Sequence, residues 1–140
     1  MIMEQGYLKK ASDAISGKRL DCVLALLDLD GFPTASPISI AKNQSIGWLA
    51  FCTFLDGSKI KRIENCNRAS VCLFSADPMY NISLVGTIEV ITDPEVKNEM
   101  WYDDLQIHFS GPSDENYCVL KFTTERYNLL FDFEEVKGSL

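Results

Sequence analysis

The chain has 140 residues, of which 46% are hydrophobic and 24% charged, so it can form one packed domain and is too ordinary in composition for a disordered protein. Its formal net charge of −7 at pH 7 disfavours general binding to nucleic acids or anionic membranes, which attract basic surfaces. Because no apolar run reaches the roughly 18 residues of a membrane helix and no signal-peptide pattern follows Met1, we expect a single cytoplasmic domain over residues 1–140.

The first third of the chain predicts a helix followed by a β-hairpin. Apolar residues recur every three or four positions across residues 4–17, which is typical of an amphipathic helix. Residues 21–29 form a short apolar run that suits a buried strand. The Asp30-Gly31 turn joins this run to the alternating residues 34–41, so the two strands are expected to pair as a hairpin.

The remainder of the chain predicts further strands with short helices between them. Strands are expected at residues 45–54, 69–76, 80–92, 117–124 and 126–133. Helices are expected at residues 58–66 and from Pro94, which follows an aspartate cap, and residues 134–140 are expected to form a loose tail. The short turns and the lack of a βαβ rhythm favour a mainly β fold, a small antiparallel barrel with about three short helices on its rim.

The segment from Thr53 to Lys59 is the part of the sequence that most suggests a binding site. A strand ends at Thr53, and a glycine-containing turn leads into a helix that starts with Ser58 and Lys59. Free N–H groups at the start of a helix attract anions, and a lysine adds a full positive charge there. The residues of this helix expected to face solvent are Lys61, Arg62 and Glu64. The local sequence suits a phosphate site, and it suits an ordinary surface helix capped by Asp56 or Ser58 rather better.

No recognisable metal or acid–base site stands out in the sequence. The cysteines are Cys22, Cys52, Cys66, Cys72 and Cys118. Since none shows C-x-x-C spacing and most lie in apolar runs, we expect reduced and mostly buried thiols. His108 is the only histidine, and metal sites need clustered ligands, so no metal is predicted.

Several motifs follow one another in a familiar order. They are a D-G-x-P hairpin at residues 30–33, an F-x-T…S-K…I…N segment at 51–65, a V-G-x-I-E-V-I-T-D strand at 85–93, a helix with Trp101, and a Y-x-V-L-K-F strand from Tyr117. Together they resemble the flavin-binding split-barrel superfamily, that of pyridoxamine 5′-phosphate oxidase, and in particular its short branch related to general stress protein 26. The resemblance covers most of the chain, from about residue 5 to residue 132.

This resemblance implies an antiparallel split β-barrel that forms a homodimer, with FMN bound in grooves between the subunits. By position, Ser58 and Lys59 fall where family members bind the FMN phosphate. Cys52 and Thr53 fall where a strand runs along the cofactor. The phosphate site suggested by the local sequence thus becomes, through the resemblance, an FMN site.

Further cofactor contacts are implied in the same way. The residues whose backbone groups fall near the isoalloxazine edge are Leu49, Ala50 and Phe51. Ser36 falls on the hairpin strand that faces the flavin. Asn81 and Trp101 match positions that reach the cofactor bound mainly by the other subunit, although Trp101 also suits a residue that anchors its helix to the barrel.

Three departures from the family pattern limit what the resemblance implies. Ser36 stands where many relatives carry an arginine, and the loss of that charge-assisted hydrogen bond removes about 1.5–3 kcal/mol of binding free energy. The usual asparagine-proline after the helix is replaced by Asn65-Cys66. The chain also lacks the C-terminal arginine-rich segment that binds pyridoxal phosphate in true oxidases, so vitamin B6 synthesis is not expected.

Three functions fit these observations. The first is an FMN-dependent oxidoreductase that acts on an unknown small molecule, with the redox chemistry supplied by the flavin. The second is a non-catalytic stress protein that binds flavin or another small ligand, and the third is a dimeric domain that has lost the cofactor. A deazaflavin or haem is an alternative to FMN, and the sequence indicates neither substrate nor electron donor.

Overall fold

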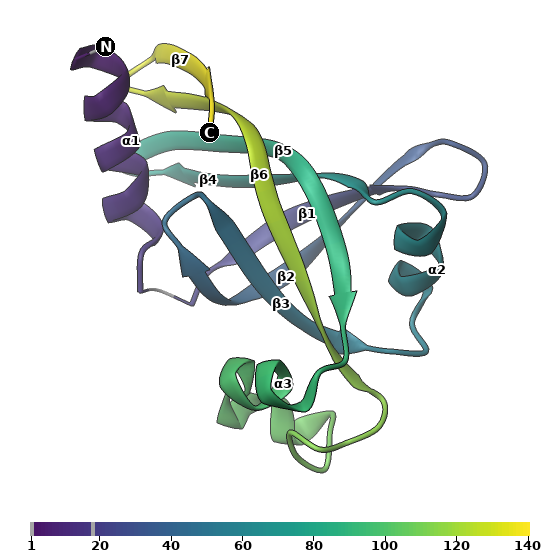
Figure 1. Cartoon of the computed structure of the whole chain (residues 1–140). Helices are drawn as coiled ribbons and strands as arrows, with labels where there is room; N and C mark the ends of the chain where they lie inside the picture. The colour runs from purple at the N-terminus through teal and green to yellow at the C-terminus, as the bar shows by residue number, and fades with distance from the viewer. Residues whose placement is uncertain (1, 18) are drawn as a thin grey trace.

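The computed structural model describes residues 2–17 and 19–140, and Figure 1 shows the order of its elements. The helices are α1 (Ile2–Ile15), α2 (Ser58–Asn65), α3 (Pro94–Met100) and the 3-10 helix η1 (Asp103–Ile107). The strands are β1 (Asp21–Leu27), β2 (Pro33–Gln44), β3 (Trp48–Phe54), β4 (Arg68–Ala76), β5 (Met79–Ile91), β6 (Tyr117–Phe131) and β7 (Glu134–Ser139).

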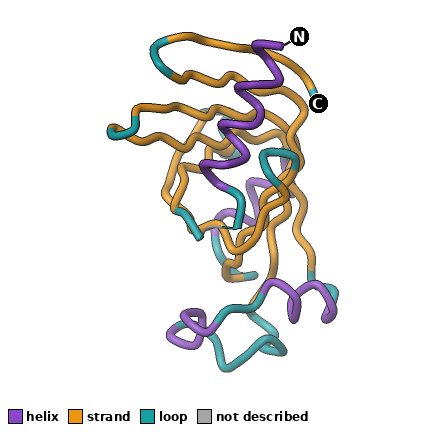
Figure 2. Tube along the Cα trace, turned by 90° about the vertical axis from the view of Figure 1, so that its left-hand side faces the viewer, coloured by secondary structure: helices purple, strands orange, loops and turns teal. Residues whose placement is uncertain are grey.

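Strands β1 to β6 close into an antiparallel barrel. Their order in the sheet is β3-β2-β1-β4-β5-β6-β7, and an additional pairing of β3 with β6 closes the ring. In Figure 1, α1 and α2 lie on opposite sides of the barrel and α3 lies beyond one end of β3 and β6. The view turned by 90° shows α1 running across the outside of the strands (Figure 2). The mainly β, antiparallel barrel expected from the sequence is therefore confirmed.

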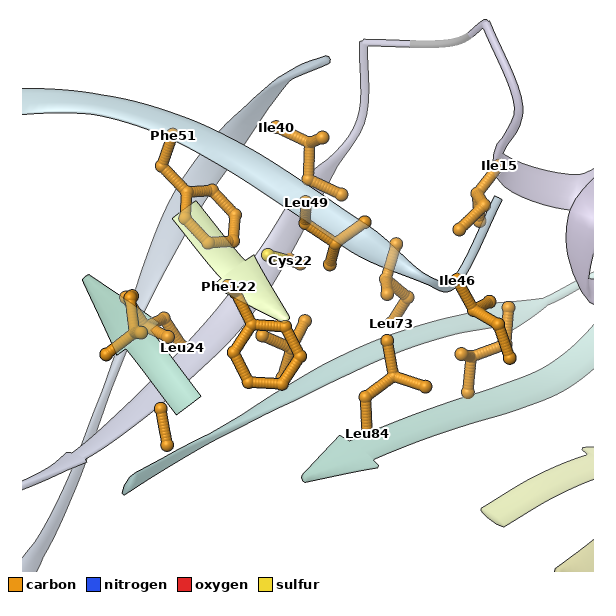
Figure 3. Close-up of a cluster of buried hydrophobic side chains, with 14 of the residues drawn as sticks. Ile15, Cys22, Leu24, Ile40, Ile46, Leu49, Phe51, Leu73, Leu84 and Phe122 are labelled. Carbon is orange, nitrogen blue, oxygen red and sulfur yellow. The ribbon is translucent and has the colours of Figure 1, made fainter. Parts of the chain in front are cut away.

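The interior of the barrel is filled by alternate residues of the strands. In β1, for example, Cys22, Leu24 and Leu26 are buried while the residues between them are partly exposed, as the two-residue period of a strand requires. Figure 3 shows side chains from several strands, including Phe51 and Phe122, meeting in this core. Helix α1 covers one side of it with a buried stripe, which confirms the predicted helix. The residues of this stripe are Tyr7, Ala11 and Ile15.

Two strands were predicted at residues 117–124 and 126–133. In the structure they form one continuous strand, β6, so the predicted break between them was wrong. Val85 of β5 pairs with Arg126, whereas Gly86 pairs with Thr124. Glu125 is thus the extra residue of a β-bulge, which bends a strand without ending it. The bulge explains why a polar residue interrupts the apolar pattern of the sequence in the middle of the strand.

The predicted loose tail is also wrong, because residues 134–139 form strand β7 along the outer part of β6. The connection is a two-residue turn in which Asp132 and Phe133 both have positive φ, of 53° and 64°. Such turns usually carry asparagine or glycine, and phenylalanine rarely adopts this conformation. The turn therefore has no recognisable signature in the sequence.

Val136 provides a test of whether β7 contributes to stability. Its side chain is 9% exposed and pairs across the strands with Leu129, whereas the next side chain, Lys137, is exposed. We expect Val136→Asn to lower the free energy of unfolding by about 2–4 kcal/mol, because it removes buried apolar area and buries an amide. Lys137→Asn is the matched control, with an expected change within about 0.5 kcal/mol. Equal urea midpoints for the two variants would contradict a packed β7.

Candidate functional site

Strands β2 and β3 separate at one end of the barrel. Their ladder runs from the Gln44–Trp48 pair to the Ile40–Phe51 pair. Beyond it, residues 33–39 of β2 pair only with β1, and residues 52–54 of β3 pair only with β6. We call these two unpaired edges the split. Their free backbone groups are available to a ligand, because no neighbouring strand of the barrel takes them up.

Helix α2 begins beside the split, directly after β3. Ile60 and Ile63, three residues apart, are buried and hold the helix against the barrel. The residue that precedes the first turn is Gly57, and no side chain caps the first N–H groups of the helix. The alternative in which Asp56 or Ser58 caps a surface helix is therefore not what the structure shows. The N–H groups of Ser58 and Lys59 remain available to an anion, whereas that of Ile60 donates to the Gly57 carbonyl over 3.3 Å.

The turn before α2 is fixed by the loop that precedes β6. The backbone N–H of Asp56 donates to the Asn116 side chain over 3.0 Å, and the N–H of Leu55 donates to the Asn116 carbonyl over 2.8 Å. Asp114 in turn accepts from the N–H groups of Ser110 and Asn116, and these hydrogen bonds lower the pKa of its carboxyl group. The start of α2 is thus positioned by a loop about 60 residues away in the sequence.

The predicted phosphate residues lie around the split. Thr53 is partly exposed on the edge of β3, Ser58 is exposed, and Lys59 is partly buried in the first turn of α2. Ser36 lies on the edge of β2 and is also partly buried. Among the described residues, the side chain of Lys59 has no ion pair. These positions bring hydroxyl groups and a cation to the same end of the barrel.

Sequence reasoning missed Arg62, which was expected to face solvent. In the structure its side chain is partly buried, and Nη1 donates to Oγ1 of Thr34 on β2 over 3.2 Å. The Thr34 hydroxyl donates in turn to the carbonyl of Leu26 over 2.8 Å. Arg62 therefore joins α2 to the β2 side of the split. A contact across 28 residues leaves no local signal in the sequence.

Leu49, Ala50 and Phe51 lie in the β3 ladder with their side chains fully buried. Their strand pairs with β2 on one side and with β6 on the other. The edge of β3 towards β2 becomes free only from Cys52 onwards. Contact between the backbone of Leu49 to Phe51 and an isoalloxazine ring stays a prediction, and in this chain Cys52 and Thr53 are the more accessible part of the strand.

Cys52 and Trp101 belong to a second apolar cluster, between β3 and α3. The Cys52 thiol lies 3.6 Å from the carbonyl of Met100 and 3.5 Å from the hydroxyl of Tyr117. Burial raises the pKa of this thiol, so it stays protonated at neutral pH. The Trp101 ring packs edge-on against Tyr117, with 5.5 Å between ring centroids. Trp101 therefore anchors the end of α3 to the barrel, and its partial exposure leaves the predicted cofactor contact as a prediction.

Asn81 lies apart from α2, on the outer face of β5. Its side-chain oxygen accepts a hydrogen bond from the thiol of Cys72 on β4, over 3.4 Å. An open groove of about 730 Å³ crosses this outer face further along the strands and includes Ala25, Ser70 and Val85. Asn81 is not part of the split, and the groove meets it only at Pro33, the first residue of β2. Within one chain, the structure therefore does not bring Asn81 together with the predicted phosphate residues.

Other kinds of site are not indicated in the part of the chain that the structure describes. No group of three or more histidine, cysteine, aspartate or glutamate side chains there is arranged to hold a metal ion. No helix within residues 2–17 and 19–140 is long and apolar enough to span a membrane. His108 is exposed and packs edge-on against Phe54, with ring centroids 5.6 Å apart, and it forms no ion pair with a described carboxylate.

An antiparallel barrel with a split between two of its strands defines the class of fold to which this protein belongs. The family model described as "Pyridoxamine 5'-phosphate oxidase like" matches residues 8–128. The chain therefore belongs to the pyridoxamine 5′-phosphate oxidase-like family, as the sequence motifs suggested. No curated protein sequence matches it.

Solved structures with the same fold have low sequence identity to this chain. A protein from Clostridium acetobutylicum related to general stress protein 26 has a TM-score of 0.77 and 18% identity over 99% of this chain and 93% of its own. An FMN-binding protein from Nostoc punctiforme has a TM-score of 0.72 and 14% identity over 97% and 94%. A haem-binding protein from Mycobacterium smegmatis has a TM-score of 0.72 and 14% identity over 95% of this chain and 57% of its own.

Proposed function

We propose that this protein binds FMN at the split and acts as an FMN-dependent oxidoreductase on a small molecule. The observation that carries the proposal is the cationic start of α2 beside the free strand edges, in a barrel of the pyridoxamine 5′-phosphate oxidase-like family. Lys59 has no ion pair among the described residues, so an anionic ligand would supply its counterion. The fit of these residues to a phosphate supports FMN over riboflavin as the ligand.

The roles of the residues follow from their places in the fold. Lys59, Ser58 and the first N–H groups of α2 would hold the phosphate, and Thr53 would lie beside the ribityl chain at the free edge of β3. FMN, once bound, supplies hydride or electron transfer. The buried neighbours of β3 keep water away from one side of the site. This division of roles agrees with the lack of an acid–base constellation among the described residues.

A homodimer is part of the proposal, because Asn81, a predicted cofactor contact, lies apart from the split of its own chain. Phe74, on the outer face of β4 beside Asn81, is 73% exposed. The groove on the same face is lined partly by the apolar residues Ala25 and Val85. A second copy of the chain would cover this apolar surface and bring Asn81 to the cofactor of its partner. Five free thiols suit a reducing cytoplasm, which we propose as the location.

The visible spectrum of the purified protein, recorded after gel filtration with light scattering, tests the proposal. We expect flavin absorption bands that travel with a dimer, or FMN binding by a colourless dimer when the cofactor is added. NADH or NADPH consumption with FMN and an electron acceptor would then distinguish an enzyme from a binding protein. A colourless monomer that binds no added FMN would contradict the proposal.

Haem is the second candidate ligand, since the structure of a haem-binding protein has a similar fold. At 14% identity this similarity shows the fold alone, so the choice between haem and FMN rests on the residues of the site. In the described residues the single histidine, His108, packs its ring against Phe54 at the end of β3, and Cys52 is a protonated thiol within a packed cluster, so neither is presented as a free haem ligand. A Soret band in place of flavin bands would favour haem over FMN.

A further inference from the structure

Arg62 lies beside the phosphate site and is held there by two hydrogen bonds in series. Its Nη1 donates to Thr34 Oγ1 over 3.2 Å, and the Thr34 hydroxyl donates to the Leu26 carbonyl over 2.8 Å. Arg62 follows Lys59 by three residues, so both side chains project from the same side of α2. The guanidinium group therefore has a defined position between the helix and the free edge of β2.

Among the described residues, no carboxylate forms an ion pair with this guanidinium group, although the Arg62 side chain is partly buried. A guanidinium group carries five N–H donors in a planar fork, and the bond to Thr34 uses one of them. A partly buried cation with unused donors at the edge of a binding site is suited to an anionic ligand.

Ser36 adds a hydroxyl group on the same side of β2. Thr34 and Ser36 are two residues apart in the strand, so their side chains lie on one face, about 6–7 Å from each other. Ser36 is short and uncharged, whereas the cationic side chain of Arg62 approaches the same strand from α2. Arg62 therefore brings a positive charge to the β2 side of the split.

We infer that Arg62 and Lys59 bind the phosphate of FMN from two sides, with Arg62 held in place by Thr34. The inference rests on the proposed function and names a second cation for that site. A phosphate monoester carries a charge between about −1.5 and −2 at pH 7, which two cations match and one does not. The planar fork of Arg62 also suits two oxygens of a phosphate group.

The test compares the affinities of Arg62→Met and wild type for FMN and for riboflavin, by flavin fluorescence titration. Methionine keeps the apolar stem of the side chain and removes its donors. We expect FMN to bind about ten- to a hundredfold more weakly while riboflavin affinity changes less than about twofold. Arg62→Lys should recover only part of the loss, because lysine has a charge without the planar fork.

Lys61→Met is the matched control. It removes the same charge from the same helix, but Lys61 is exposed on the other side of the buried Ile60–Ile63 row. We expect less than about a threefold change in FMN affinity for this variant. Equal thermal midpoints of the variants would show that each is folded.

The possible outcomes distinguish the role of Arg62 from FMN binding itself. An Arg62→Met variant that prefers FMN over riboflavin as strongly as wild type does would overturn the role of Arg62 and leave FMN binding intact. An equal loss for Lys61→Met would show that the effect is general electrostatics, which also overturns it. A wild-type protein that binds neither flavin would overturn the proposed function and this inference together.

Discussion

Lys59→Met is expected to weaken FMN binding about ten- to a hundredfold and to leave riboflavin binding nearly unchanged. Lys59 is in the first turn of α2, where its charge adds to that of N–H groups that no side chain caps. The two ligands differ only in the phosphate, so the ratio of their affinities isolates the contact with that group. The ratio is measured by fluorescence titration of wild type and variant at one salt concentration, since salt screens the interaction.

A loss that is equal for both flavins would place Lys59 near the ring or ribityl chain, or would indicate a distorted barrel. Far-UV circular dichroism and the urea midpoint of the variant separate these two cases. The side chain is partly exposed, so its removal by itself should cost little stability. With an intact barrel, an equal loss contradicts the phosphate placement, and the proposed FMN function then depends on the visible spectrum alone.

Lys59 and Arg62 should not act independently if both bind one phosphate. The effects of substitutions at distant sites add, whereas those of groups with a shared partner do not. In a double-mutant cycle, Lys59→Met/Arg62→Met should therefore lose less than the product of the two single losses, because the ligand has only one phosphate to lose. Independent sites would give the full product.

The sequence and the structure agree most closely where local signals are strong. The helix predicted at residues 58–66 is α2, at Ser58–Asn65, because Ile60 and Ile63 have helical spacing and a glycine precedes the first turn. The hairpin of β1 and β2 follows from its Asp30-Gly31 turn, in which Gly31 has a positive φ of 87°. These features depend on residues that are close together in the chain.

The errors occur where distant residues decide the structure. The bulge at Glu125 depends on the partner strand, and the Asp132-Phe133 turn lacks the residues that usually mark it. The orientation of Arg62 depends on Thr34, far away in the sequence. The candidate site could thus be located by Lys59 and Ser58, but the position of Arg62 could not be predicted, since the barrel alone brings α2 and β2 together.

Gly86→Ala adds only one methyl group, yet it is expected to lower the free energy of unfolding by about 2–4 kcal/mol. A Cβ atom at Gly86 would collide with the backbone carbonyl of Thr123 on β6, next to the bulge. The atoms that this Cβ would meet belong to the main chain of Thr123 and Thr124 in a paired strand, so they cannot move aside as a side chain would. The usual gain of about 0.4–1 kcal/mol from a less flexible unfolded chain is too small to compensate.

Gly111→Ala is the matched control, because a Cβ at Gly111 would meet nothing within 4 Å. Urea unfolding of both variants should show a lower midpoint for Gly86→Ala and an unchanged or slightly higher one for Gly111→Ala. Thr123 also pairs with Trp48 of β3, so the collision at β6 would displace the strand that leads to Thr53 and α2. Gly86→Ala should therefore weaken FMN binding from a distance, whereas wild-type stability in this variant would mean that β5 and β6 are less close at the bulge than the structure places them.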